Sequence, residues 1–334
     1  MSGPSSKNNI QTTRQESGRW LEIVNKMDNA EILDALFRQA VSAIDSGDVT
    51  TLEHLLATHP ELAHERLNSP GAWLREKVSG ALDGFFQKPY LLWFVAEDPV
   101  RNGKLPHNIG QITRTIIKVA GRDGVQSLQE QLDYALRLVC WSWIARECGV
   151  QIELIDVLVD AGASLDGRRE YQGHCGAHCD SAIFNGNFAA AEHLLERGAP
   201  LTLSAALCLG RWADVERLAG TATLAEKQDA FVLAALNGKA EALGRMLALG
   251  VDPTTVSTQN YSHATALHHA VCSGSIDAVK VLVEAGADLT KRDTVYGGTP
   301  LGWAGHYEEE QKGKARGEQF KEIAEYLREK GQQG

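Results

Sequence analysis

The stretch Thr265-Ala-Leu-His-His-Ala-Val-Cys-Ser-Gly274, followed by Ile276-Asp-Ala-Val-Lys-Val-Leu-Val-Glu-Ala-Gly286, carries the strongest structural signal in this chain. Thr265 can cap the start of a helix, and Gly274 can end it because glycine accepts a left-handed backbone conformation. The second segment places apolar residues at helical spacing and stops at Gly286. This pattern predicts two short antiparallel helices joined by a tight turn. One such pair cannot bury its apolar side alone, so neighbouring pairs must stack.

The same glycine punctuation recurs along the chain. Paired glycines lie ten to thirteen residues apart, and each pair encloses a helical segment with a similar apolar pattern. Five internal units of two helices are therefore predicted. Their glycine pairs are Gly149 and Gly162, Gly186 and Gly198, Gly210 and Gly220, Gly238 and Gly250, and Gly274 and Gly286.

Three further copies are weaker, and each is expected to contain two helices. The expected pairs are 40–47 with 49–56, Leu91–Ala96 with Ile109–Val119, and Thr299–Ala304 with a segment that starts at Phe320. The middle pair is distorted, because a long loop separates its helices. Together these copies make about eight units over residues 31–330.

The unit that begins at Thr265 resembles an ankyrin repeat. The segment Thr299-Pro-Leu-Gly-Trp-Ala304 resembles the Thr-Pro-Leu-His-x-Ala signature of that family, with Gly302 in the histidine place. The irregular N-terminal copies make the chain similar to bacterial ankyrin-repeat proteins. The resemblance implies an all-α ankyrin-repeat solenoid of about eight helix-turn-helix units, several degenerate, with inserted loops. It also implies a non-catalytic adaptor, in which His268 is a structural histidine that bonds within and between repeats.

Composition and charge argue against several classes of protein. The 334-residue chain is 43% hydrophobic, enough for a sizeable core, and no run of about eighteen apolar residues predicts a membrane span. A net charge of -10 argues against nucleic-acid binding, which needs a concentrated basic face. The polar start of the chain shows no targeting signal, so cytoplasmic residence is expected. No cofactor is predicted, because no cofactor-binding motif is present.

A single solenoid is expected over residues 31–330, after a disordered or irregular tail and lead-in helix at 1–30. The expected insertions lie at about 67–88, 97–108 and 307–319. The first contains the segment from Trp73 to Phe86, a plausible short amphipathic helix. These insertions are either tolerated surface loops or parts of a ligand site, because a solenoid accepts insertions only on faces that its neighbours do not use.

Aromatic and imidazole side chains mark a candidate binding face. In an ankyrin array, the concave side is formed by the finger before each first helix and by the residue between the signature histidine and alanine. These positions predict a groove that binds a protein or peptide. The candidate residues are Phe94, Arg101, Tyr171, His174, Tyr261, His263, His269, Tyr296, Trp303, His306 and Tyr307. Aromatic stripes also arise from packing between repeats, which is the role expected for Trp93, Trp141 and Trp143.

A different class of function is the alternative: a small-molecule-binding protein or unusual enzyme with its pocket in the concave groove. Long insertions and degenerate units favour it. The absence of a nucleophile elbow, phosphate loop or dinucleotide motif argues against it. Its acid–base residues would be drawn from His174, His178, Asp180, His269 and His306.

The segment from His174 to Cys179 is a weak candidate for a metal site. Its donors would be His174, Cys175, His178 and Cys179, which are residue types that bind zinc. Counting back from Gly186, however, places Cys179 at the signature leucine position, which points into the core. A finger followed by a helix start is therefore the favoured interpretation, and no metal is predicted.

Overall fold

The computed structural model describes residues 29–122, 127–167, 176–258 and 262–333. The chain forms two compact units that divide near residue 165. The described part is helical, apart from an isolated antiparallel bridge between Val256 and Thr265. The predicted all-α class is therefore confirmed. None of the described helices is long and apolar enough to cross a membrane.

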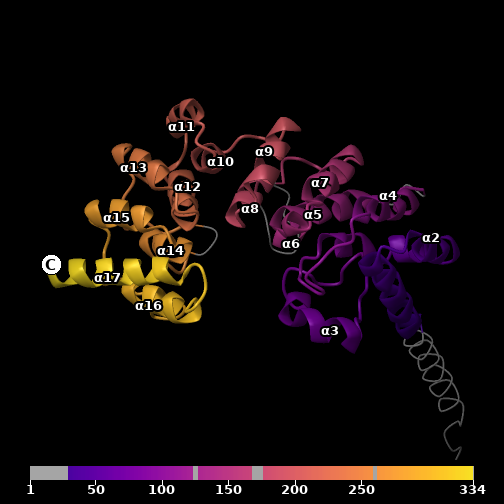
Figure 1. The fold of residues 1–334 in the computed structure, drawn as a ribbon. Helices are drawn as coiled ribbons and strands as arrows, with labels where there is room; N and C mark the ends of the chain where they lie inside the picture. Colours follow the sequence, from indigo (N-terminus) through magenta and orange to yellow (C-terminus); the bar gives the residue numbers. More distant parts are fainter. Residues whose placement is uncertain (1–28, 123–126, 168–175, 259–261, 334) are drawn as a thin grey trace, which may run out of the picture. The chain divides into compact units, whose positions relative to one another are not determined.

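The first unit begins with a helix over 29–46 and continues through short helices and 3-10 turns. Its further elements are α2 (Val49–Thr58), η1 (Pro60–Ala63), α3 (Ala72–Val78), η2 (Ser79–Leu82), η3 (Leu91–Ala96), α4 (Ile109–Ala120), α5 (Leu128–Trp141), α6 (Trp143–Glu147) and α7 (Gln151–Asp160). Helix α4 packs between α2 and α7, and α5 packs against η3 and α7 (Figure 1). The second helices of successive pairs thus form one row, as stacking requires.

Helix α5 was not predicted, and its burial explains why. Every residue from Gln131 to Cys140 is buried. A helix that is buried on all sides lacks the one-sided apolar pattern by which a surface helix is recognised. Its polar residues need partners in the core, and the Gln131 side chain donates to the Ala63 carbonyl at 3.1 Å.

The three tryptophans expected to be packing residues differ in their burial. Trp93 is fully buried and its ring centroid lies 4.5 Å from that of Tyr134, so its core role is confirmed. Trp141 is half-buried and contacts Phe85, with ring centroids 6.1 Å apart. Trp143 is 50% exposed, because it stands at the start of the short helix α6. The prediction of a core role for Trp143 is therefore wrong.

The first insertion does not form one helix from Trp73 to Phe86. Ser79 has a φ of 45°, which a right-handed helix cannot contain. Helix α3 therefore ends at Val78, and the 3-10 turn η2 follows. The change of direction folds the insertion back on itself.

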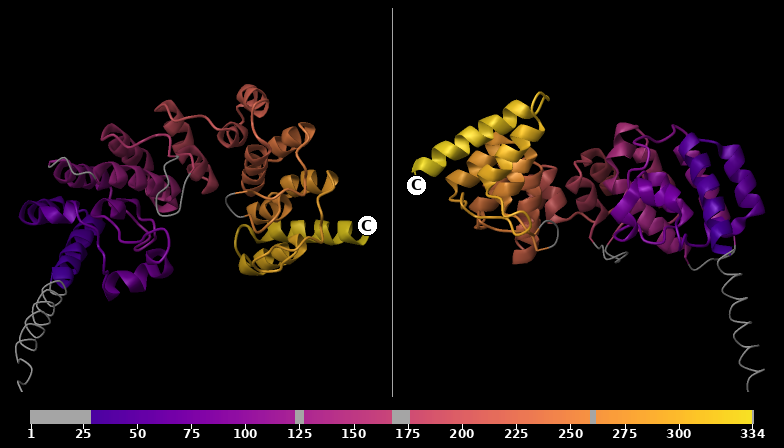
Figure 2. Two further views of the ribbon diagram at one scale, coloured as in Figure 1. Left: turned by 180° about the vertical axis from the view of Figure 1, so that it is seen from behind. Right: turned by 90° about the horizontal axis from the view of Figure 1, so that it is seen from below.

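The second unit is a regular stack of helix pairs. Its elements are α8 (His178–Phe184), α9 (Phe188–Glu196), α10 (Leu203–Cys208), α11 (Trp212–Ala219), α12 (Leu224–Leu236), α13 (Ala240–Ala248), α14 (Ala266–Ser273), α15 (Ile276–Glu284), α16 (Pro300–Glu310) and α17 (Gly317–Gln333). First helices pack in the series α8, α10, α12, α14, α16, and α13, α15 and α17 form the row of second helices (Figure 2). This is the solenoid that the repeated helix pairs predict.

The glycine stops behave as predicted at most positions. Gly274 has a φ of 76° and Gly286 a φ of 90°, so both have the left-handed conformation that ends a helix. Gly220 is the exception, with a φ of -64°. It ends α11 in a right-handed conformation, so the prediction of a left-handed stop there is wrong.

The third insertion is shorter than expected. Helix α16 continues to Glu310, so residues 307–310 are helical rather than looped. Tyr307 explains the extension, because its ring stacks on Phe320 of α17 at 5.2 Å and its hydroxyl lies 3.2 Å from the Cys272 sulfur. These contacts hold one more helical turn against the stack.

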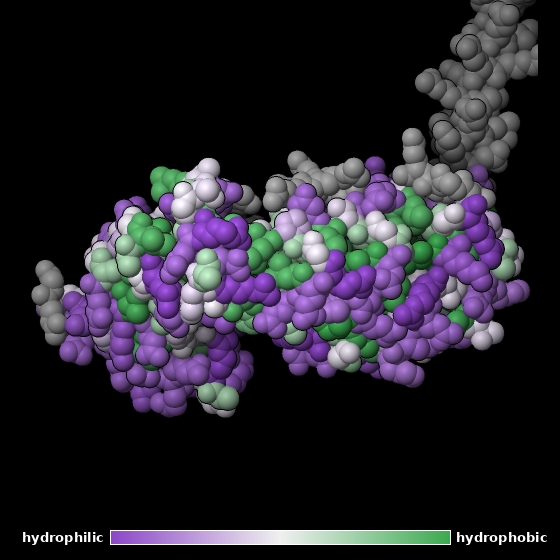
Figure 3. All heavy atoms as spheres, turned by 90° about the horizontal axis from the view of Figure 1, so that it is seen from above, coloured by the Kyte–Doolittle hydropathy of each residue, from purple (hydrophilic) through white to green (hydrophobic). Residues whose placement is uncertain are grey.

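Hydrophilic side chains cover much of the face drawn in Figure 3, with hydrophobic side chains between them. Large apolar side chains with high exposure are scattered through the described residues, as is normal for folded proteins. Val295 and Tyr296 differ because they are consecutive, with 62% and 79% of their surface exposed. The finger before α16 thus presents apolar surface at its tip.

Candidate functional site

His268 connects the repeat that starts at Thr265 to the next finger. Its Nδ1 faces the backbone N–H and the hydroxyl of Thr265, at 3.3 and 2.8 Å. An N–H aimed at Nδ1 requires an acceptor there, so Nε2 carries the proton and donates to the Gly298 carbonyl at 3.1 Å. Burial lowers the pKa of His268, which favours this neutral form. The structural role implied for His268 is confirmed.

Asp293 organises the finger before α16. Its Oδ1 accepts the N–H groups of Val295 and Tyr296, at 2.9 and 2.6 Å. Its Oδ2 accepts the N–H of Gly298 at 2.8 Å and the indole N–H of Trp303 at 2.9 Å. Burial alone would raise the pKa of Asp293, but these donors outweigh burial and hold the pKa well below its usual range. The ionised carboxylate therefore fixes both the finger and the Trp303 ring.

Trp303 is the centre of a group of rings. Its ring centroid lies 6.0 Å from that of His263, 6.1 Å from that of His269 and 6.4 Å from that of Tyr307. Tyr296 joins this group through His263, at 6.2 Å. Most of these contacts are edge-to-face, with interplanar angles of 75° to 89°. We call these five residues the ring cluster.

The members of the ring cluster differ in their access to solvent. Tyr296 is exposed, and His263, Trp303 and Tyr307 are half-buried. His269 is only 2% exposed, because the rings of His263 and Trp303 lie against it. The expectation that His269 faces a partner is therefore wrong, and its role is to support the rings above it.

Charged groups of both signs lie near the ring cluster. His306 is exposed on α16, and its ring centroid lies 5.5 Å from that of Tyr307. The following Glu309 pairs with Lys312 at 3.3 Å. On the finger, the Arg292 guanidinium donates to the Gly297 carbonyl at 2.6 Å. The cluster is thus a rigid aromatic surface with a mixed polar edge, which suits recognition.

Residues 181–293 and 231–333 match the family model described as ankyrin repeats (3 copies). The matched segments include the finger and helices that build the ring cluster. Residues 181–333 are ankyrin repeats. Ankyrin repeats are generally protein–protein interaction modules.

A comparison with solved structures found the human ASB11 ankyrin repeat domain, at 16% sequence identity and a TM-score of 0.32. The similarity covers 69% of this chain and 95% of that domain. A TM-score this low carries no argument about this chain, and the ankyrin assignment rests on the family model. No curated protein matches the chain in sequence.

Phe94 is not part of an ankyrin groove. It has no exposed surface, and its ring packs between those of Phe37 and Phe86, with centroids at 6.5 and 5.2 Å. The prediction that Phe94 contacts a partner is wrong. The residue lies in a 3-10 turn, η3, in which all six residues are buried, so neither side of the turn can line a surface.

Arg101 is also buried rather than placed in a groove. The exposed fraction of its side chain is 1%, and its guanidinium pairs with Asp45 at 2.8 Å and with Glu97 at 3.1 Å. Glu97 Oε1 accepts the backbone N–H groups of Arg101 and Gly103, both at 2.9 Å, and that of Asn102. The second insertion therefore folds around a buried carboxylate. The prediction of Arg101 as a binding residue is wrong, because this ion pair keeps it inside.

The candidates on α8 do not join the ring cluster. His178 is 1% exposed, and Asp180 accepts a hydrogen bond from the Thr202 hydroxyl. Burial raises the pKa of the Cys179 thiol to about 12, which disfavours the thiolate that metal binding and nucleophilic attack require. In the series of first helices, α10 and α12 separate α8 from α14. The acid–base set of His178, Asp180 and His269 is thus not brought together.

Several predicted site residues fall outside the described ranges. They are Tyr171, His174, Cys175 and Tyr261. The predicted metal candidate therefore has two of its four donors outside the description. Among the residues that the structure does describe, no group of three or more His, Cys, Asp or Glu side chains is placed to hold a metal ion.

Asp293 is the important residue that sequence reasoning missed. A signal was present, because an aspartate followed closely by Gly297 and Gly298 is typical of a turn in which the carboxylate accepts backbone N–H groups. The contact with Trp303 had no such signal, since it depends on how the finger lies against α16.

Proposed function

We propose that this ankyrin-repeat protein binds a protein or peptide partner through the exposed rim of the ring cluster. This rim consists of Tyr296 and of His306, which lies beside Tyr307. The main support is an aromatic surface that is fixed in position and still exposed to solvent. Asp293 fixes the finger and Trp303 through hydrogen bonds, and Tyr296 at the tip of the finger is 79% exposed. A surface that is already rigid loses little entropy when a partner binds. Tyrosine and tryptophan are the residue types that most often anchor protein interfaces.

The net charge of -10 supports a protein partner over a nucleic acid, because phosphate binding needs many clustered cations. As part of this proposal, the protein resides in the cytoplasm and its partner is another intracellular protein. The small-molecule or enzymatic alternative in the groove has less support. Of its acid–base candidates, His178 and His269 are buried and lie on helices that are not neighbours, and His174 falls outside the described ranges.

The test replaces the exposed side chains of the rim and keeps Asp293 and Trp303, which hold the ring cluster in place. In the variant Tyr296→Ala with His306→Ala, both substitutions fall on exposed side chains, so stability should change by less than about 0.5 kcal/mol each. Capture of the partner from cytosol should be lost, as measured by affinity purification and quantitative mass spectrometry.

The matched control is Leu224→Ala, which removes another exposed apolar side chain, 67% exposed, from a different repeat. It should leave capture unchanged. If the rim variant captured the same proteins as the wild type, or if the control lost them equally, the ring cluster would not be the binding surface.

A further inference from the structure

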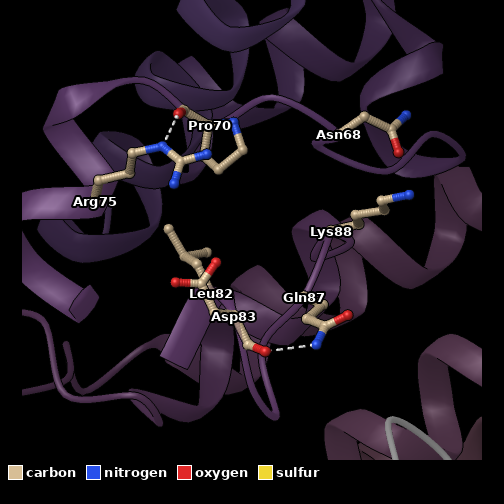
Figure 4. A pocket seen from close by; sticks show the side chains of 7 residues that line it. All are labelled: Asn68, Pro70, Arg75, Leu82, Asp83, Gln87 and Lys88. Carbon is tan, nitrogen blue, oxygen red and sulfur yellow. Dashed lines mark hydrogen bonds between the residues drawn. The ribbon is translucent and has the colours of Figure 1, made fainter. Parts of the chain in front are cut away.

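The first insertion forms an open pocket with a mixed polar and apolar lining, separate in sequence from the ring cluster. The pocket has a volume of about 290 Å³, close to the lower end of the range of about 300–1,000 Å³ that holds small ligands. Figure 4 shows Arg75 and Pro70 on one side of the opening and Asp83 and Gln87 across from them. The buried side chain of Leu82 forms an apolar part of the lining.

The walls of this pocket are held in place by hydrogen bonds. At the two ends of the insertion, the Leu67 N–H donates to the Pro89 carbonyl at 2.9 Å. At the start of α3, Asp34 accepts the Gly71 N–H at 2.8 Å and the Trp73 indole N–H at 2.9 Å. These hydrogen bonds thus tie the backbone of the insertion, which carries the lining side chains, to the helix over 29–46.

The Arg75 guanidinium is oriented by one hydrogen bond and has further N–H donors for a ligand. The Arg75 Nε donates to the Pro70 carbonyl at 3.0 Å, which orients the side chain (Figure 4). Its two terminal nitrogens are left to bind another group. A guanidinium that presents two parallel N–H groups is suited to a carboxylate.

The opposite wall carries a carboxylate. The Gln87 amide donates to the backbone carbonyl of Asp83 at 2.7 Å, not to its side chain (Figure 4). In the described part of the chain, neither the Asp83 carboxylate nor the Lys88 ammonium has an ion-pair partner. A pocket lined by Arg75, Lys88 and Asp83 carries two positive charges and one negative charge.

We propose that this pocket binds a small acidic α-amino acid. The α-carboxylate would bind the Arg75 guanidinium, and the ammonium would bind Asp83. The second carboxylate would bind Lys88, whose exposed side chain would turn toward the opening from the outward position drawn in Figure 4. A simple anion such as phosphate fits less well, because Asp83 would repel it. A simple cation fits less well, because Arg75 and Lys88 outnumber the single carboxylate. This binding is independent of the partner binding proposed above.

The experiment is saturation-transfer NMR on the full chain with L-glutamate and glutarate as separate probes. Inorganic phosphate, which has no carbon-bound protons to observe, is added as a competitor, and its affinity is read from the loss of the glutamate signal. Glutamate should bind at millimolar concentrations. Glutarate has the same two carboxylates without the amine, so it should bind at least about tenfold more weakly, as expected for the loss of one charge-assisted hydrogen bond.

Two variants test which residue binds the carboxylate of the ligand and which binds its ammonium. Arg75→Gln should weaken glutamate binding at least about tenfold, and Asp83→Asn should remove the preference for glutamate over glutarate. Glu76→Gln is the matched control, because Glu76 is an exposed charge on the same helix outside the pocket lining, and it should bind like the wild type. Thermal melts check that each variant folds.

Three results would overturn the proposal. They are the absence of saturation transfer from glutamate to the wild type, equal affinities for glutamate and glutarate, and tighter binding of phosphate than of glutamate. Because Arg75 and Asp83 are exposed, their replacement should leave the fold intact. The two variants and the comparison of probes test the proposal separately.

Discussion

At the scale of single residues, two polar side chains determine how the last repeats fit together. His268 and Asp293 are both buried, and each forms hydrogen bonds with more than one segment. A buried polar group is stable only if its partners are in place, so each residue selects one arrangement of the finger and helix beside it. The ring cluster depends on this arrangement, since Asp293 fixes Trp303.

The first prediction concerns Asp293→Asn. The substitution replaces an acceptor oxygen with an amide group that cannot accept the N–H groups of Gly298 and Trp303. We expect a loss of about 1–3 kcal/mol in the free energy of unfolding at neutral pH. Because the folded pKa of Asp293 lies below its unfolded value, its stabilisation is present above the unfolded pKa and is lost as the pH falls.

The difference in stability between wild type and Asp293→Asn should therefore shrink below about pH 4, the usual aspartate pKa. Urea unfolding at a series of pH values measures it. A constant difference down to pH 2 would show that the carboxylate charge is not what stabilises the finger.

At the scale of elements, the second insertion shows that a loop outside the repeat pattern can be a fixed structural part. Residues 97–108 separate η3 from α4, and their first residue is a fully buried glutamate. Glu97 binds three successive backbone N–H groups and the Arg101 guanidinium. The loop therefore cannot unfold without breaking the buried ion pair between Glu97 and Arg101 and the hydrogen bonds of Glu97 to the backbone.

The second prediction concerns Glu97→Ala, which leaves the Arg101 charge buried with only Asp45 beside it. Removing one partner of a buried ion pair costs about 3–5 kcal/mol, so the first unit should unfold at a markedly lower urea concentration. Glu97→Gln keeps an oxygen acceptor for the backbone N–H groups and should lose less. Equal stability of the wild type and Glu97→Ala would mean that the loop is not held by this carboxylate.

At the scale of the whole molecule, each unit contains its own rows of stacked helices. In the second unit α17 is the last layer, and it packs on α16 and α15. Phe320, Ile323 and Leu327 are its large buried apolar residues. Most of the other residues of α17 are exposed, so the helix has one apolar and one polar face. A continuous solenoid over 31–330 stays a prediction.

The third prediction follows from the packing of α17 on α15 and α16. A chain that ends at residue 316 should lose the burial of those three side chains, about 1.5–3 kcal/mol for each. Because contacts in a solenoid are between neighbours, hydrogen exchange should increase most in α15 and α16 and least in α8 and α9. Unchanged exchange in α16 would show that α17 does not stabilise α16.

The sequence by itself determined the helix pairs, because their signals are local. Gly274 and Gly286 stop helices through their own backbone freedom, and apolar spacing marks the face that each helix buries. His263, Tyr296, Trp303 and Tyr307 were predicted from their places in the repeat. The structure groups their rings, and their role in binding stays a prediction. Only the tertiary structure decided what each side chain faces: neighbours from other elements cover His269, Phe94 and Arg101, and α5 is buried on every side. Burial depends on which segments meet in space, and a local pattern does not contain that information.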